Sequence, residues 1–226
     1  DDGSSSNNTS NTIHSTINIT AVNDAPQLTG SSSVTYTENN SAIIINAAIV
    51  LSDVDASVLG NARVSITNYV AGEDNLSFVP NANTGNIIAS FNTTTGVLTL
   101  TSPDGTGTIA QFQAAFRAVR YSNSSEAPNV APRDISYIVD DGESANNLSN
   151  VIHSTVNVVA INDAPTLSGT TTISYTENNA ATPINTVITL TDNDSSLIDH
   201  ATIIITNFVA GEDVLSFIPN ANTGNI

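Results

Sequence analysis

Apolar and polar residues alternate along much of this chain, in short runs separated by turn-forming residues. In residues 12–22, Ile13, Ile17 and Ile19 fall on one face of an extended segment and His14 on the other. The same alternation returns later, in residues 64–67, 134–139 and 151–161. A period of two is typical of strands with one buried face. Each of these segments is therefore predicted to be a β-strand.

Shorter signals extend this pattern. Val34 and Tyr36 fit a short strand, and residues 43–51 form an apolar, β-branched run. Residues 87–91 and 97–101 flank a polar turn, which indicates a hairpin. Seven or more short strands with turns between them predict an all-β fold made of antiparallel β-sandwiches.

One segment departs from the β pattern. Ile109, Phe112 and Phe116 recur at three- and four-residue spacing, and Thr108 can cap the helix that this spacing predicts. We expect one short helix per repeat, near residues 109–119, covering one end of the core. Its two phenylalanines are predicted core residues.

The whole pattern repeats at an offset of 139 residues. Asn23-Asp24-Ala25-Pro26 returns as Asn162-Asp163-Ala164-Pro165, and residues 1–87 match residues 140–226 at 53 of 87 positions. A period of this length is the size of one domain. Three regions follow from it: 1–24 as the C-terminal strand region of a preceding repeat, 25–163 as a complete repeat, and 164–226 as the N-terminal part of the next. We expect a segment of a longer tandem array, in which the last region cannot close a core without further strands.

The net charge limits the kinds of partner that the chain can bind. The chain has a net charge of −17, with four arginines, no lysine and no cysteine. Such a chain is unsuited to nucleic acid, whose phosphates need basic partners, and to anionic membrane surfaces. No apolar run approaches the length of a membrane span. A divalent cation suits this charge, and a secreted bacterial protein suits the composition.

The acids gather at strand ends and turns. Calcium binds six to eight oxygen ligands from carboxylates, carbonyls, amides and water, so these positions are candidate ligands. They are Glu38, Asp53, Asp55, Glu73, Asp74, Asp140, Asp141, Glu143, and the pairs Asn23-Asp24 and Asn162-Asp163. The alternative is that they are solvated turn formers, because Asp and Asn favour turns.

Four of these motifs together resemble cadherin repeats, most closely the bacterial cadherin-like repeats of giant secreted adhesins. The motifs are Tyr36-Thr37-Glu38-Asn39, Asp53-Val54-Asp55, Asp141-Gly142 and Asn23-Asp24-Ala25-Pro26. The resemblance covers the whole chain and implies calcium ions between successive sandwiches.

The resemblance also implies ligands for two joints between repeats. The first would use Asn23, Asp24, Asp53, Asp55 and Asp141 or Asp140. The second would use Glu38, Asn162, Asp163, Asp192 and Asp194.

Three departures reduce the expected number of ions to one or two per joint. The animal linker has an acidic residue ahead of the Asn-Asp pair and an Asn after it, whereas here the nearest positions are alanines, 21 and 160 ahead and 25 and 164 after. The third departure is that the acidic Asp-Arg-Glu-type motif is not evident, and Asp104 is a poor substitute for it. Glu73-Asp74 and Glu212-Asp213 match no ligand of the animal repeats, and the sequence leaves their role open.

The function that follows is a calcium-stiffened repeat of an extracellular bacterial adhesin or surface stalk, with further copies of the repeat as its partners. One alternative is a subunit of an extracellular filament, sheath or biofilm-matrix fibre, in contact with neighbouring chains. Another is a polysaccharide-binding module that recognises surface glycans. An enzyme is not expected, because no Gly-x-Ser-x-Gly elbow is present and His14 and His153 have no spaced partner.

Overall fold

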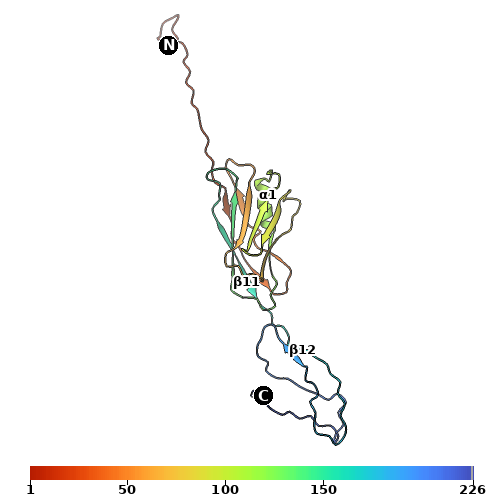
Figure 1. Ribbon diagram of the computed structural model, residues 1–226. Helices are drawn as coiled ribbons and strands as arrows, with labels where there is room; N and C mark the ends of the chain where they lie inside the picture. The colour runs from red at the N-terminus through yellow and green to blue at the C-terminus, as the bar shows by residue number, and fades with distance from the viewer. Residues whose placement is uncertain (225) are drawn as a thin grey trace. The chain divides into compact units, whose positions relative to one another are not determined.

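The computed structural model describes every residue except 225 and divides the chain into two compact units, Asp1–Asp163 and Ala164–Ile226 (Figure 1). The first unit contains a six-stranded sheet with the order β2-β11-β10-β5-β8-β7. Its strands are Ser33–Thr37, Ile152–Val159, Arg133–Asp140, Asn61–Ile66, Val97–Thr101 and Ile88–Asn92, in that order.

Two smaller sheets complete this unit. One has the order β3-β9-β6 and the other pairs β1 with β4. Their strands are Ile43–Ile44 (β3), Val119–Asn123 (β9), Asp74–Phe78 (β6), Gln27–Thr29 (β1) and Val50–Ser52 (β4). The predicted all-β fold is confirmed. The pairing is not wholly antiparallel, however, because β11 runs parallel to β2, with Val156 opposite Val34.

A single core lies between the six-stranded and three-stranded sheets. Alternate residues of β5, β8 and β10 point into it, which explains the period of two in these segments. Tyr36 meets Tyr121 of the other sheet edge to face, with ring centroids 5.4 Å apart. Phe116 of the helix meets Tyr137 in the same way at 5.7 Å. The first unit is therefore a β-sandwich whose layers are joined by aromatic contacts.

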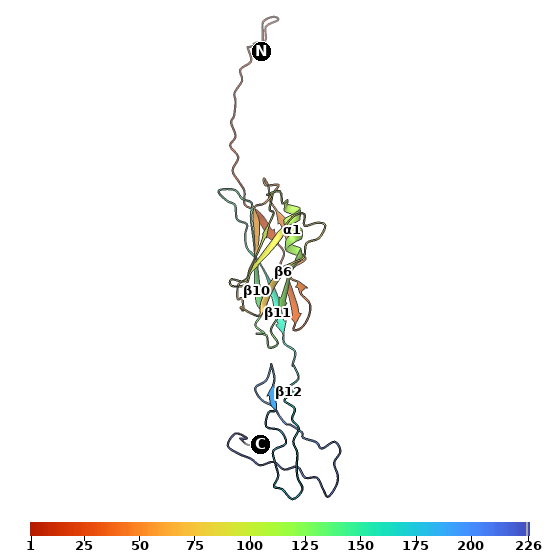
Figure 2. The same ribbon diagram turned by 45° about the vertical axis from the view of Figure 1, so that its right-hand side comes forward.

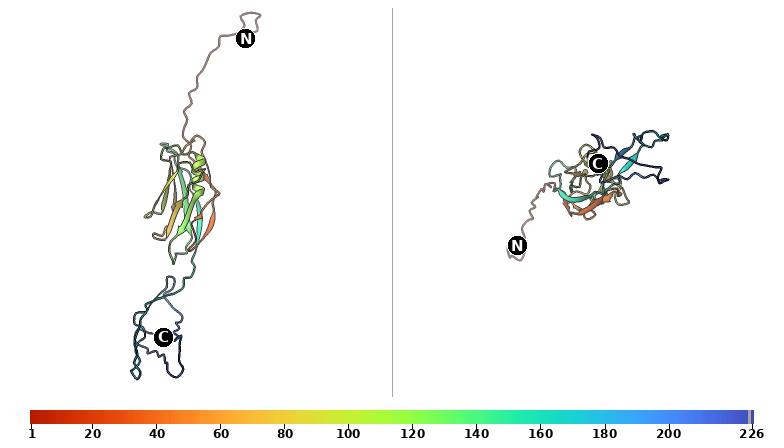
Figure 3. Two further views of the ribbon diagram at one scale, coloured as in Figure 1. Left: turned by 90° about the vertical axis from the view of Figure 1, so that its right-hand side faces the viewer. Right: turned by 90° about the horizontal axis from the view of Figure 1, so that it is seen from below.

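The single helix of the described residues, α1 (Ile109–Ala118), lies alongside the strands of the sandwich (Figure 2, Figure 3). Phe112 and Phe116 are fully buried, as predicted. Thr108 accepts a hydrogen bond from the Gln111 N–H, and the Gln111 side chain accepts one from the Thr108 N–H. This reciprocal pair is a capping box, which satisfies two backbone donors that the first turn would otherwise leave unpaired.

Replacing Thr108 with alanine should destabilise the sandwich by about 1 kcal/mol, because one of these donors loses its acceptor. Urea unfolding followed by circular dichroism measures the change. Thr94→Ala, in the exposed turn between β7 and β8, is a matched control for hydroxyl loss. Equal unfolding free energies for the Thr108 variant and the unsubstituted chain would contradict this role of the cap.

The predicted strand at residues 12–22 is wrong for this structure. The segment is extended but pairs with no strand, and Ile13, Ile17 and Ile19 are 84–89% exposed. The equivalent residues of the complete repeat form β11, which is held between β10 and β2. An alternating pattern describes the faces of a strand, but the strand itself needs a partner for its backbone.

The second unit has little sheet structure of its own. β12 (Thr166–Ser168) pairs with β13 (Thr189–Thr191) in the same register as β1 with β4. Most of its large apolar residues are exposed, among them Ile203, Val214 and Phe217. In the first unit, the residue equivalent to Ile203 is the fully buried Val64, and the residue equivalent to Phe217 is the partly buried Phe78.

Among the described residues, no helix is long and apolar enough to cross a membrane.

Candidate metal centre

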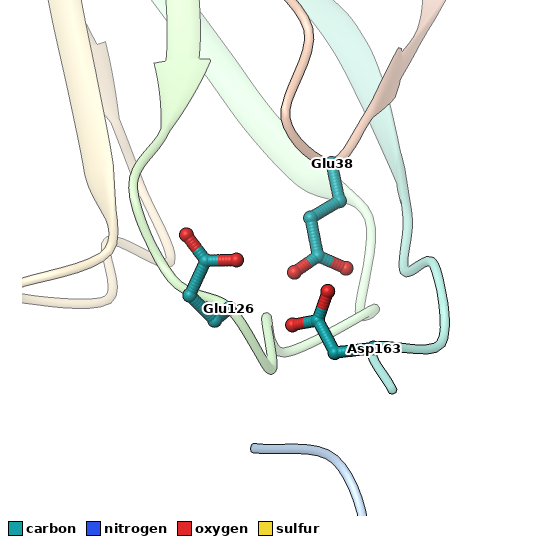
Figure 4. Close-up of side chains that lie close together, drawn as sticks. All are labelled: Glu38, Glu126 and Asp163. Atoms are coloured by element: carbon teal, nitrogen blue, oxygen red, sulfur yellow. The ribbon is translucent and has the colours of Figure 1, made fainter. Parts of the chain in front are cut away.

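Three carboxylates from distant parts of the chain meet at one end of the first unit. Glu38 follows β2, Glu126 lies in the loop between β9 and β10, and Asp163 follows β11. One carboxylate oxygen from each lies within 4.8 Å of the others, and the three side chains point toward one another (Figure 4). Sheet pairing explains part of this arrangement, since parallel pairing of β2 with β11 brings their C-terminal ends to the same edge.

Glu38 is the buried member of this cluster, which we call the Glu38 centre. The residue is only 2% exposed. Its Oε2 atom accepts the Ile161 N–H at 2.7 Å, whereas its Oε1 atom is buried without a hydrogen-bond partner. An unpaired buried oxygen on a charged group is unfavourable by several kcal/mol unless a donor or a cation satisfies it. Oε1 therefore fits the position of a metal ligand.

The donor set suits a hard cation. Calcium prefers oxygen ligands at about 2.3–2.6 Å and accepts carboxylates in flexible geometry. Three carboxylates this close repel one another, and an ion between them would turn that repulsion into attraction. The residues of the Glu38 centre therefore fit calcium chemically, and Glu38, Glu126 and Asp163 are the side chains that would hold it.

Sequence reasoning identified Glu38 and Asp163 but missed Glu126. Glu126 is a single glutamate in a nine-residue loop, 124–132, and belongs to none of the motifs that the sequence offered. The available signal was its position directly after a strand, the same signal that identified the other acids. Asn162 lies beside this centre in sequence, and its side-chain amide donates to the Asp163 carbonyl at 2.7 Å.

Asp192 and Asp194, the remaining predicted ligands of the second joint, lie in the second unit. The Asp192 Oδ1 atom accepts the N–H groups of Asp194 and Ser195 at 2.9 and 2.7 Å. Asp53 makes the same turn in the first unit, with Asp55 and Ala56. The Asp-x-Asp motif thus has one local structure in both places.

The ligands predicted for the first joint lie together in the first unit. The Asn23 amide donates to Asp141 Oδ2 at 2.8 Å, and the Asp24 N–H donates to Asp55 Oδ2 at 3.2 Å. Asp53 Oδ2 is a further buried oxygen without a partner. In the described part of the chain, no three acids of this group approach one another as closely as those of the Glu38 centre.

The resemblance allows either Asp140 or Asp141 of the Asp-Gly turn as a ligand of the first joint, and the contacts favour Asp141. Asp140 Oδ1 accepts hydrogen bonds from the Gly142 N–H at 2.8 Å and from the Asn147 amide at 3.1 Å. These contacts hold the Asp140 side chain within the turn of residues 140–147. Asp141 is the acid that contacts Asn23.

Glu73 and Asp74 belong to a buried ionic network. The Arg133 guanidinium is fully buried, and its Nε donates to both carboxylate oxygens of Asp74 at 2.9 and 2.8 Å. Its Nη2 lies 3.2 Å from Glu73 Oε2. Tyr121 donates its hydroxyl to Asp74 Oδ1 at 2.6 Å, and burial, followed by this carboxylate, raises the pKa of the tyrosine. The motif that sequence reasoning left unexplained therefore joins β6, β9 and β10 inside the sandwich.

Two other candidates have local roles. The Asp104 carboxylate accepts hydrogen bonds from Thr106 and Ser102, which lower its pKa, and it stabilises the turn before α1. His153 lies on the outer surface with its ring 2.9 Å from Asp134. Neither residue joins the Glu38 centre.

No protein-family model matches this chain, and no curated protein matches it. Among solved structures, the chain is similar to one chain of a type I cohesin–dockerin complex from Clostridium thermocellum, at 7% identity and a TM-score of 0.35. The match covers 63% of this chain and all of the other. A similarity this low assigns neither a fold family nor a partner.

Proposed function

We propose that this chain is a calcium-stiffened segment of a tandem-repeat protein on the bacterial cell surface or outside the cell, with a structural role in adhesion. Its function would be mechanical, with calcium fixing the joint between successive repeats. The observation that carries the proposal is the buried, unpartnered Oε1 atom of Glu38, which faces the carboxylates of Glu126 and Asp163.

Three further observations support this reading. The Glu38 centre lies directly before the point at which one repeat passes into the next, at Asp163-Ala164. The same Asp-x-Asp turn occurs at the start of both repeats, so oxygen ligands are available on the far side of each joint. The net charge of −17 favours cation binding and disfavours contact between neighbouring repeats without a cation.

Calcium should lengthen and stiffen a tandem array. The test uses two copies of residues 25–163 joined end to end, which recreates the Asn-Asp-Ala-Pro joint. Small-angle X-ray scattering should give a larger maximum dimension in calcium than in chelator, because carboxylates that repel one another become shared ligands. Glu38→Gln in the first copy should reduce the difference. Identical scattering in the two conditions would refute the stiffening role.

A further inference from the structure

We propose that Glu73 is a positioning residue for the Glu38 centre. It would hold the loop of residues 124–132 so that Glu126 faces Glu38 and Asp163. This inference rests on the proposed binding of calcium by those three acids, and it gives the Gly72-Glu73-Asp74 motif a role beyond stability.

Glu73 contacts the loop on both sides of Glu126. Before Glu126, the Ser124 N–H donates to the Glu73 carbonyl at 2.9 Å, and the Ser124 hydroxyl donates to the Gly72 carbonyl at 3.2 Å. After it, the Asn129 N–H donates to the Glu73 Oε2 atom at 3.0 Å. The ligand is thus carried on a short span of chain that one residue fixes at both ends.

The anchor is itself fixed by the core. The Glu73 side chain is 20% exposed and lies 3.2 Å from the fully buried Arg133 guanidinium. Glu126, by contrast, is exposed, as is its neighbour Ala127. Without the second anchor, the loop would sample more conformations, and calcium would have to order it on binding. That ordering opposes binding, so the affinity falls.

The Glu73 side chain has two roles. It accepts the Arg133 Nη2 group at 3.2 Å, while the Arg133 Nε donates to both oxygens of Asp74 at 2.9 and 2.8 Å and Nη1 donates to the Ala131 carbonyl. The charge of the buried guanidinium is therefore balanced by Asp74 even when Glu73 is replaced, although Nη2 then loses its acceptor. The second contact, to the Asn129 N–H, does not involve Arg133 and belongs to the loop that carries Glu126.

Calcium titration by calorimetry on the 226-residue chain tests the inference. Glu73→Ala should weaken binding about tenfold, the scale of effects seen when a supporting residue of a metal site is removed. Glu73→Gln keeps an acceptor for the Asn129 N–H and should retain most of the affinity. Glu212→Ala, at the equivalent position of the next repeat, should leave binding at the Glu38 centre unchanged. If Glu73→Ala does not fold in chelator, Glu73→Asp keeps the charge beside Arg133 but withdraws the anchor, and it should also weaken binding.

A double-mutant cycle separates positioning from general destabilisation. If Glu73 acts through Glu126, then Glu73→Ala should have no further effect on calcium affinity in the Glu126→Gln background. The positioning role alone would be overturned if Glu73→Ala lowered the calcium affinity equally in the unsubstituted chain and in the Glu126→Gln background. It would also be overturned if the Glu73 variants that fold bound calcium with unchanged affinity. Unchanged affinity in Glu126→Gln itself would overturn the metal centre, and the inference with it.

Discussion

Replacing Arg133 with alanine is expected to destabilise the sandwich by about 3–5 kcal/mol, the range observed when one partner of a buried ion pair is removed. The Asp74 carboxylate would remain buried without a cation beside it, and it would keep the hydrogen bonds from Tyr121, Asn123 and the Val70 N–H. Equilibrium unfolding in urea in the presence of chelator measures the loss without a contribution from metal.

Two comparisons sharpen this prediction. Arg63→Ala removes an exposed arginine of β5 and should change the unfolding free energy by less than about 0.5 kcal/mol. Replacing Arg133 and Asp74 together should be less destabilising than the sum of the two single changes, because neither charge is then left alone. A loss of under about 1 kcal/mol for Arg133→Ala would show that the network is not the structural centre described above.

Removing calcium is expected to have the next largest effect. A ligand that binds only the folded state at a concentration of 100 times its Kd adds about 2.7 kcal/mol to the unfolding free energy. Chelator should remove that contribution and lower the melting temperature. Glu38→Gln should abolish most of the difference between calcium and chelator, because it removes the charge from the buried ligand.

In chelator, Glu38→Gln should have the opposite effect on stability. The new amide can donate to the carboxylates of Glu126 or Asp163, and it removes one of three repelling charges. Glu38→Gln should therefore be more stable than the unsubstituted chain without metal and less stable with it. Equal stability of the unsubstituted chain in calcium and in chelator would exclude a coupled metal site.

Local chemistry made several parts of the fold predictable. The helix at residues 109–118 follows from Thr108 and the spacing of Ile109, Phe112 and Phe116, all close together in the sequence. The hairpin of β7 and β8 follows from a polar turn between two apolar strands. In both cases the deciding contacts join residues close in sequence, and such contacts can be recognised without knowledge of the rest of the chain.

Long-range partners were not predictable in this way. The alternation in residues 12–22 is as regular as that in β11, yet only β11 has neighbours that can pair with it. The parallel pairing of β11 with β2 joins residues more than a hundred positions apart, and no local signal marks it.

The candidate site shows the same division. The motif resemblance predicted Glu38, Asp163 and the group around Asn23 as ligands, and two of these residues, Glu38 and Asp163, lie in the acidic cluster. Glu126 lies on a loop that is held by contacts with Glu73 and Arg133. Its position in the site therefore depends on tertiary contacts, which no local motif predicts. Asp74 shows the converse, since a buried, paired acid and a metal ligand look alike in sequence until the partner, here Arg133, is known.

The most direct test of the central claim is a calcium titration of the 226-residue chain with and without Glu126→Gln, the ligand that no sequence motif marks. The account predicts saturable calcium binding in which one site loses at least about tenfold in affinity when Glu126 loses its charge, while Glu212→Gln binds as the unsubstituted chain does. Absence of calcium binding, or the same affinity in the Glu126 variant, would contradict a metal centre at Glu38, Glu126 and Asp163.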